Sequence, residues 1–190
     1  MCEQPARRAA LRRGGPLALL LVLLVACGPG GTAAPMGSTA PDPAFNATDT
    51  AWLQLMIPMT EHMADALALA ADHSDDPGLR GLAAAVLIEH RAELDRLRAL
   101  RVAAGLPDTD VHAGHRMPGM VTAADLIVLR ADHGAEFDRH LRPLLDEHLA
   151  QSGVLATGEL ANGQQQGVKS LARAIERNRS QERERLRALH

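Results

Sequence analysis

Apolar side chains recur at every third or fourth position over most of the chain after residue 45, which is the pattern of helices with one buried face. The first stripe comprises Trp52, Met56, Met59, Met63, Ala66 and Ala70, and the second comprises Leu79, Leu82, Val86, His90, Leu94 and Leu97. The third begins at about Ala135 and comprises Phe137, Leu141, Leu145, His148 and Leu155, and the fourth comprises Val168, Leu171, Ile175, Leu186 and Leu189. The pattern predicts an all-α protein with four long helices.

Capping residues place the starts of these helices. Asp49 is a candidate N-cap of the first, and Asp76-Pro77 places a cap before proline at the first helical position of the second. Thr122 is expected to cap a short extra helix that ends at Arg130.

Glycine and proline mark the breaks. Gly105-Leu106-Pro107 should end the second helix, and the segment 161–166 should form a loop. Pro143 should kink the third long helix or make its first turns irregular, because proline cannot donate the helical hydrogen bond.

The two halves of this region resemble each other at a shift of 89 residues. Gly78 falls on Gly167, Glu93 on Glu182, and the run 96–100 is identical to 185–189. We therefore expect two related helical hairpins packed as an up-down four-helix bundle. The first repeat spans about 49–105, the crossover 106–133 and the second repeat about 134–190, and the connection 104–122 is expected to cross one end of the bundle.

The N-terminal segment has the pattern of a bacterial lipoprotein signal. Arg7, Arg8, Arg12 and Arg13 precede a short apolar run, Pro16 to Val25, that is too short for a comfortable membrane span. The residues before Cys27 match a lipobox, so 1–26 is expected to be removed and Cys27 lipidated. An ordinary signal peptide cut nearby is the alternative. Residues 27–44 are rich in Gly, Pro, Ser, Thr and Ala and indicate a flexible linker. The folded part is thus expected outside the cytoplasm, tethered to the cell membrane.

Charge and cysteine content exclude several functions. Removal of 1–26 leaves 16 basic and 22 acidic side chains, which argues against nucleic-acid binding and weakens any case for contact with anionic lipid. Cys27 would then be the single remaining cysteine, so no thiolate is left for catalysis or zinc.

The crossover carries the most suggestive chemistry. A Gly/Pro-rich stretch of nine residues, 112–120, contains His112, His115, Met117 and Met120. Imidazole and thioether together suit a soft metal, above all Cu(I), whereas zinc, calcium and magnesium prefer other donors. The alternative is a solvated loop whose methionines plug the end of the bundle.

Inward positions on the long helices supply further candidate ligands. Met59, His90 and His148 lie on the core stripes, and the first helix adds His62 and Met63. Polar groups in a core need partners, so these residues form either a metal site or a hydrogen-bonded core.

Charged residues of the helices have two candidate roles. Glu93 and Glu182 could orient ligand histidines from behind, or pair with nearby arginines. The final helix from Arg173 to Arg187 is dense in both charges and is expected to be a solvated face.

Known catalytic patterns are missing. No Asp or Glu has a histidine three residues later, which excludes a ferritin-type di-iron centre, and the chain has neither a phosphate-binding loop nor a Gly-x-Ser-x-Gly elbow. The sequence therefore predicts a binding protein, not an enzyme, with an oxidative enzyme as a remote third hypothesis.

Three segments resemble the DUF305 family: Met56-Ile57-Pro58, the loop from His115 to Thr122, and Gly134 to Arg139. The resemblance covers roughly Asp49 to Leu189. It implies a small secreted or lipid-anchored bacterial protein with a ferritin-like, duplicated helical bundle, and a link to copper handling in some members.

The chain departs from the family pattern at the expected ligands. Members carry a His-His pair after Met-Ile-Pro and another in the second half, whereas here the pairs are Met59-Thr60 and His148-Leu149. This departure implies either a site retuned toward thioether ligands or a degenerate site on a surviving scaffold. The first hypothesis is therefore a lipid-anchored copper-buffering or copper-delivering protein. The alternative is a metal-free module that docks another protein of the cell envelope.

Overall fold

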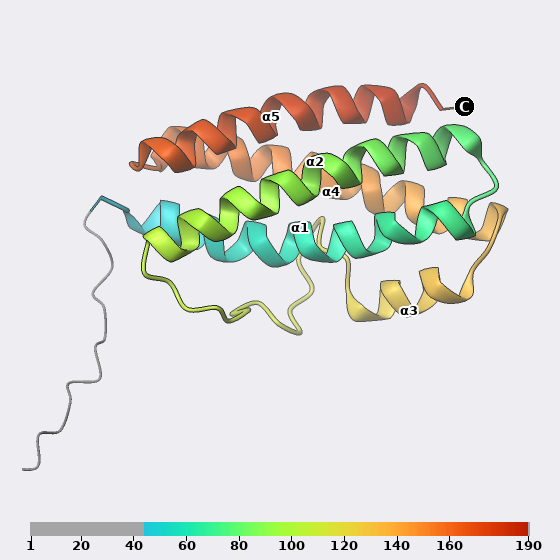
Figure 1. Cartoon of the computed structure of the whole chain (residues 1–190), viewed down its shortest axis with the longest axis horizontal. Coiled ribbons are helices and arrows are strands. Elements are labelled where there is room, and N and C mark those ends of the chain that lie inside the picture. The colour runs from blue at the N-terminus through green and yellow to red at the C-terminus, as the bar shows by residue number, and fades with distance from the viewer. Residues whose placement is uncertain (1–43, 190) are drawn as a thin grey trace, which may run out of the picture. The chain divides into compact units, whose positions relative to one another are not determined.

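The computed structural model describes residues 44–189 and consists there of five helices without a β-strand. They are α1 (Ala47–His73), α2 (Pro77–Ala103), α3 (Ala123–Ala131), α4 (Ala135–Asn162) and α5 (Gln166–Arg187) (Figure 1). The predicted all-α class is confirmed. The predicted signal peptide, Cys27 and the linker up to residue 43 lie outside the described residues. Within these helices, no segment is long and apolar enough to cross a membrane.

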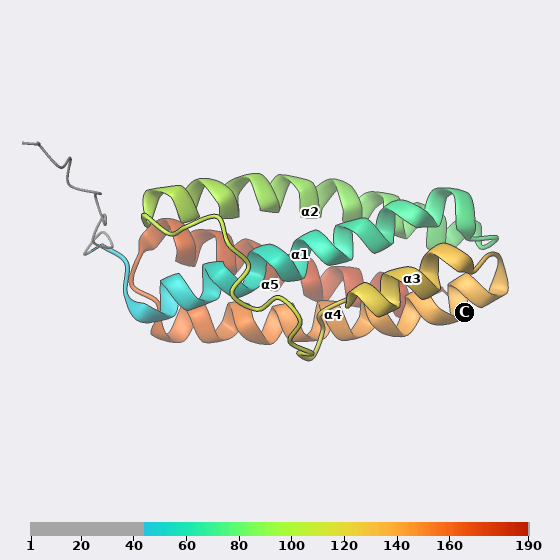
Figure 2. The same ribbon diagram turned by 90° about the horizontal axis from the view of Figure 1, so that it is seen from below.

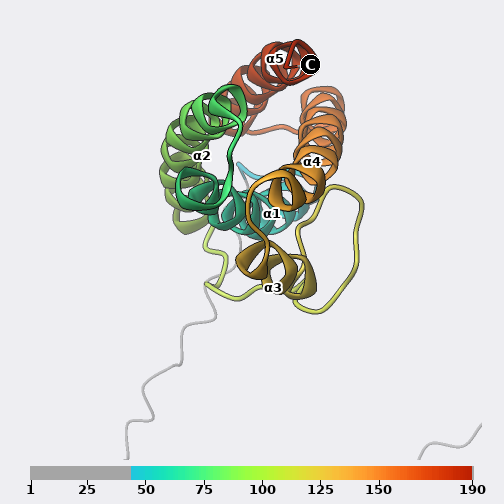
Figure 3. The same cartoon turned by 90° about the vertical axis from the view of Figure 1, so that its right-hand side faces the viewer.

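The four long helices form two antiparallel hairpins, α1–α2 and α4–α5. Seen along the helices, α1 lies beside α4 and α2 lies beside α5, so the four make a ring (Figure 3). The second hairpin begins where α1 ends, since the N–H of Gly134 donates to the His73 carbonyl at 2.7 Å. At the other end of the bundle, the Asn46 side chain donates to the carbonyl of Asn162, the last residue of α4, at 2.8 Å.

The crossover follows the side of the bundle, and the expectation that it crosses one end is wrong. α2 ends at the opposite end of the bundle from the start of α4, so the chain must travel the length of the bundle to begin the second hairpin. Residues 104–122 and α3 do this along α1 and α4 (Figure 2). The crossover therefore covers the α1/α4 side and brings its histidines and methionines there.

Local signals account for most of the helix boundaries. Asp76 accepts from the N–H of Gly78 and Leu79 at the start of α2, and Thr122 caps α3 through a capping box with Asp125. The N-cap of α1 is Asn46, and Asp49 is the third helical residue of its capping box. α4 is one uninterrupted helix across Pro143.

The contacts between the hairpins obey the two-fold relation that the 89-residue repeat implies. A Cβ on Gly78 would lie 2.8 Å from Leu189, and a Cβ on the equivalent Gly167 would lie 3.2 Å from Leu100, the equivalent of Leu189. Each glycine thus lets the last leucine of the opposite repeat pack against a helix N-terminus.

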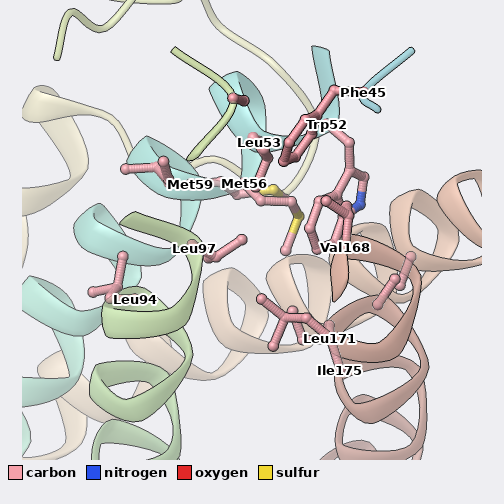
Figure 4. Close-up of a cluster of buried hydrophobic side chains, with 14 of the residues drawn as sticks. Phe45, Trp52, Leu53, Met56, Met59, Leu94, Leu97, Val168, Leu171 and Ile175 are labelled. Atoms are coloured by element: carbon pink, nitrogen blue, oxygen red, sulfur yellow. The ribbon is translucent and has the colours of Figure 1, made fainter. Parts of the chain in front are cut away.

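The apolar interior falls into two clusters. The first core cluster joins Trp52 and Met56 of α1, Leu97 of α2 and Ile175 of α5 near the first turns of α1 and α5 (Figure 4). The second core cluster contains Met63, Leu79, Phe137, Leu141 and Leu145, among others. Both consist of residues 45–186, so this part of the chain buries its own core.

A carboxyl pair ties the start of α1 to the turn between α4 and α5. Asp49 accepts from the N–H of Asn46, Gln164 and Gln165, and its side chain faces that of Glu159, which is 1% exposed. Burial opposes ionisation of Asp49, but these hydrogen bonds outweigh it and lower the pKa. Burial and the Asp49 carboxylate raise the pKa of Glu159 to about 8, with a partly opposing effect of Lys169. At neutral pH, Glu159 therefore keeps its proton.

The pair should make stability fall with alkaline pH. Between the pKa of an unfolded glutamate, 4.5, and about 8, the folded protein holds a proton that the unfolded chain has lost, so the free energy of unfolding decreases as pH rises. We expect Glu159→Gln to stabilise the protein at pH 9 by about 1–3 kcal/mol and to have little effect near pH 5. Thermal unfolding of both proteins across this pH range is the measurement. The matched control is exposed Glu147→Gln, and a pH-independent difference for Glu159→Gln would contradict a buried, protonated Glu159.

Candidate metal centre

Two histidines from different hairpins meet in the middle of the bundle. His90 of α2 and His148 of α4 are both fully buried, and their Nε2 atoms lie 2.9 Å apart. Nδ1–H of His148 donates to the Gly119 carbonyl at 3.2 Å. Because this fixes the proton on Nδ1, Nε2 of His148 must accept from Nε2–H of His90. We call these residues the inner histidine pair.

Both rings of the inner histidine pair are neutral at physiological pH. Burial, together with the positive charge of Arg179, lowers the pKa of His148 to about 3, although the bond to Gly119 opposes the shift. Burial, Arg179 and His148 lower the pKa of His90 well below its usual value. Nδ1 of His90 is then unprotonated and has no hydrogen-bond partner, since the nearby Val86 carbonyl is itself an acceptor. The pair thus offers a neutral nitrogen lone pair that remains unsatisfied in the interior.

A buried ion triad fills the space beside the inner histidine pair. Arg179 is 1% exposed and binds Glu93 of α2 at 2.5 Å and Glu182 at 3.0 Å. Its Nε also donates to Ser152 Oγ at 2.9 Å. Burial raises the pKa of Glu182; the guanidinium opposes this shift and Glu93 reinforces it. Burial also disfavours the charged form of Arg179, but the two glutamates outweigh it and raise the pKa of Arg179. Glu93 and Glu182 therefore pair with arginine and do not orient a histidine, and the expectation of a fully solvated final helix is wrong for Arg179 and Glu182.

The segment Gly119-Met120-Val121, which we call the strap, holds histidines of both hairpins. The Gly119 carbonyl accepts from His148, and the Val121 carbonyl accepts from Nδ1–H of His62 on α1 at 2.9 Å. Each bond fixes the ring and leaves Nε2 unprotonated, the arrangement typical of metal-ligating histidines.

The strap lies too close to α1 and α4 for a side chain at position 119. Gly119 has φ 73°, and a Cβ there would lie 2.7 Å from Met59 Cε and from Gln151 Cβ. Glycine is therefore required for this approach. The glycine of the Met-Pro-Gly-Met motif is the sequence signal for this close approach, but the motif does not indicate which helices the strap contacts.

The outer side of the strap borders a pocket of about 440 Å³. We call it the outer pocket; the potential ligands among its lining residues are His62, Asp110, His112, His115 and Met120. The ring centroids of His112 and His115 are 6.4 Å apart, and Gly114 between them has φ 78°. The pocket therefore combines three imidazoles, a thioether and a carboxylate, a donor set that fits a soft or borderline metal ion.

The remaining candidate residues lie beside the strap or in the apolar core. Met59 lies under Gly119 and belongs to the first core cluster, whereas Met63 is fully buried in the second core cluster. Met117 is half-buried and packs on the first core cluster. The nine candidates thus lie on either side of the strap, and all four methionines also pack in the core. Met59 and Met120 belong to the first core cluster, Met117 packs on it, and Met63 belongs to the second.

The donors are near one another but not gathered around one point. Within residues 44–189, no three His, Cys, Asp or Glu side chains stand in a ligating arrangement. A metal in the outer pocket would therefore need a thioether ligand or a movement of the His112–His115 loop toward His62.

The sequence profile of the DUF305 family, described as a domain of unknown function, matches residues 49–190. The chain belongs to the DUF305 family. No curated protein matches it.

Solved structures of similar fold include other DUF305 proteins. A fragment from Deinococcus radiodurans has a TM-score of 0.70 at 20% identity over 77% of this chain and 97% of its own. A Streptomyces coelicolor protein, inferred to be secreted, has a TM-score of 0.65 at 20% identity over 73% and 89%. CopM in its Cu(I)-bound form has a TM-score of 0.63 at 19% identity over 75% and 95%. At these identities the likeness establishes the helical fold.

Replacement of the buried Arg179 should reduce the stability of the fold far more than replacement of an arginine near the surface. Arg179→Met leaves Glu93 and Glu182 buried without their counter-charge, which should cost about 3–5 kcal/mol of stability. Arg183→Met removes a half-exposed pair with Asp146 and should cost less than about 1 kcal/mol. Denaturant unfolding of both variants is the measurement, and equal losses would contradict the role of the triad.

Proposed function

We propose that this protein binds Cu(I) outside the cytoplasm, through the histidines and methionines on either side of the strap, and buffers or delivers the ion. The observation that carries the proposal is the strap itself. It fixes His62 and His148 with their Nε2 atoms unprotonated and places Met120 between the two carbonyls that hold them.

The donor chemistry supports copper over other metals. Neutral imidazole and thioether are soft or borderline ligands, and Met59 and Met120 lie on the two sides of the strap. The outer pocket is open to solvent, so an ion can reach His62 without unfolding of the bundle, and Met120, which is 8% exposed, lies at the wall of the same pocket. The fold shared with Cu(I)-bound CopM adds support at the level of scaffold.

A metal-free scaffold is the second candidate function, and one observation favours it. The Nε2 atoms of the inner histidine pair already bond each other, and Arg179 supplies a fixed positive charge beside them. A metal ion at the inner histidine pair would be repelled by the positive charge of Arg179. We therefore assign Cu(I) binding first to the outer pocket.

The location we propose is the outer face of the cell membrane, with Cys27 carrying the lipid. The lipobox sequence supports this anchor, and the inferred secretion of the Streptomyces coelicolor relative agrees with an extracytoplasmic position.

Copper binding should depend on the sulfur of Met120. Met120→Leu keeps the apolar volume, and we expect the Cu(I) affinity to fall about tenfold or more, or about 1.4 kcal/mol, since a ligand is lost. Met63→Leu in the second core cluster makes the same chemical change away from the pocket and should leave affinity unchanged. A Cu(I) competition titration against a colorimetric chelator under reducing conditions measures both. Equal affinities for all three proteins would remove Met120 from the site, and wild-type binding no tighter than a generic His/Met peptide would favour the scaffold.

The anchor is tested separately. Cys27→Ser should abolish incorporation of labelled fatty acid and move the protein from the membrane fraction to the soluble extracytoplasmic fraction. Copper affinity of the purified protein should not change, because Cys27 is not among the proposed ligands. Retention of the label in Cys27→Ser would contradict lipidation at this residue.

A further inference from the structure

The charges of the bundle are sorted onto opposite sides. α2 and α5 together carry twelve arginine and lysine residues against six acidic ones. The remainder of 44–189 carries four arginines against fifteen acidic residues. Since α2 and α5 are neighbours in the ring, the positive residues belong to one side of the bundle and the negative ones to the side of α1, α4 and the crossover (Figure 3).

Six arginines on α2 and α5 are exposed and have no ion pair within the described part of the chain. They are Arg91, Arg96, Arg173, Arg177, Arg185 and Arg187. Exposed acidic residues on the same two helices are limited to Asp95 and Glu184. The outer surface of this helix pair, which we call the cationic face, therefore presents a large excess of unpaired guanidinium groups. Guanidinium is the side chain best suited to phosphate, because it can donate two parallel hydrogen bonds.

The cationic face also carries apolar side chains that no other element covers. Ile88 is 68% exposed and Val102 is 71% exposed, both on α2. The crossover and α3 pack on α1 and α4 and leave this side of the bundle open. Arginines interspersed with exposed aliphatic side chains are typical of helices that lie in the interface of an anionic bilayer.

We propose that the cationic face binds the anionic phospholipid surface of the membrane to which the chain is tethered. This inference rests on the proposed lipid anchor. The 16 residues between Cys27 and Ala44 have a contour length of about 55 Å, whereas a helix of 27 residues is about 40 Å long, so the tether permits the bundle to lie along the bilayer. Each arginine near such a surface strengthens binding severalfold. The negative net charge argued against lipid contact, but it resides on the opposite side of the bundle.

This orientation has a consequence for the outer pocket. His62 and Met120 lie on the α1/crossover side, so the pocket would face away from the bilayer. The acidic residues on that side would attract metal cations from solution, while the lipid headgroups neutralise the cationic face.

Vesicle flotation with metal-free residues 28–190, which lack the lipid, tests the proposal. We expect binding to phosphatidylcholine vesicles that contain about 30% phosphatidylglycerol, no binding to pure phosphatidylcholine, and loss of binding at about 0.5 M salt. The triple variant Arg173→Gln, Arg177→Gln, Arg187→Gln should bind roughly 10- to 100-fold more weakly. The control triple Arg116→Gln, Arg130→Gln, Arg139→Gln changes the net charge equally on the other side and should bind within about twofold of the wild type.

Each other outcome would overturn the proposal. Equal losses in the two triple variants would show a response to net charge alone, and no binding of the wild type would leave the face without a lipid role. Binding to soluble dextran sulfate but not to vesicles would make it a polyanion site. Because the assay contains neither copper nor a lipidated cysteine, its failure is separate from failure of the copper titration or of the Cys27→Ser experiment. Circular dichroism of both triple variants checks that the fold is retained.

Discussion

Arg179, enclosed with Glu93 and Glu182 in the middle of the bundle, is the constraint around which the interior is organised. A guanidinium that is 1% exposed must have its charge compensated, and both glutamates are recruited for this purpose from the positions that the repeat makes equivalent. Burial, reinforced by this charge, keeps His90 and His148 neutral. These polar residues fall between the two apolar clusters along the helices, so the core consists of two apolar halves separated by a polar layer. The layer joins α2, α4 and α5 and favours one register among them, because a shift of one helix would leave buried charges unpaired.

The strap connects this layer to the surface. Its Gly119 carbonyl reaches the inner histidine pair, and its Val121 carbonyl, two residues later, reaches His62 on the outer side. A path of three residues thus separates the fully buried imidazole of His148 from that of His62, which borders the outer pocket. Since Met59 contacts the strap from below and Met120 lies within it, a soft ion would find sulfur on either side of the same backbone segment.

The sequence predicted the helices and the inward positions well, because both follow from spacing along one element. The stripes placed Met59, His90 and His148 inside, and Asp76-Pro77 and Thr122 marked helix starts that the structure has. Properties that depend on the relation between distant elements were not accessible. Arg179 was grouped with the solvated charges of its helix because its burial depends on Glu93, 86 residues away. The predicted path of the crossover was wrong for a similar reason. Whether the chain must run the length of the bundle depends on the direction of α4 relative to α1, which the sequence of the crossover does not contain.

The net charge of the chain is another property that does not reveal how charges on distant elements are arranged, and hence which surfaces the protein can contact. A chain with more acidic than basic residues is expected to avoid anionic surfaces, yet electrostatic attraction depends on the face presented and not on the sum. Here the helical repeat distributes arginines to α2 and α5, while the crossover, packed against α1 and α4, adds its aspartates to the opposite side. A tethered bundle with this asymmetry has one orientation that is electrostatically favourable near an anionic bilayer. In that orientation, the side which contains the histidines and methionines is also the side open to solution. The proposed membrane contact and the proposed metal access are therefore compatible, because they use different helices of the same ring.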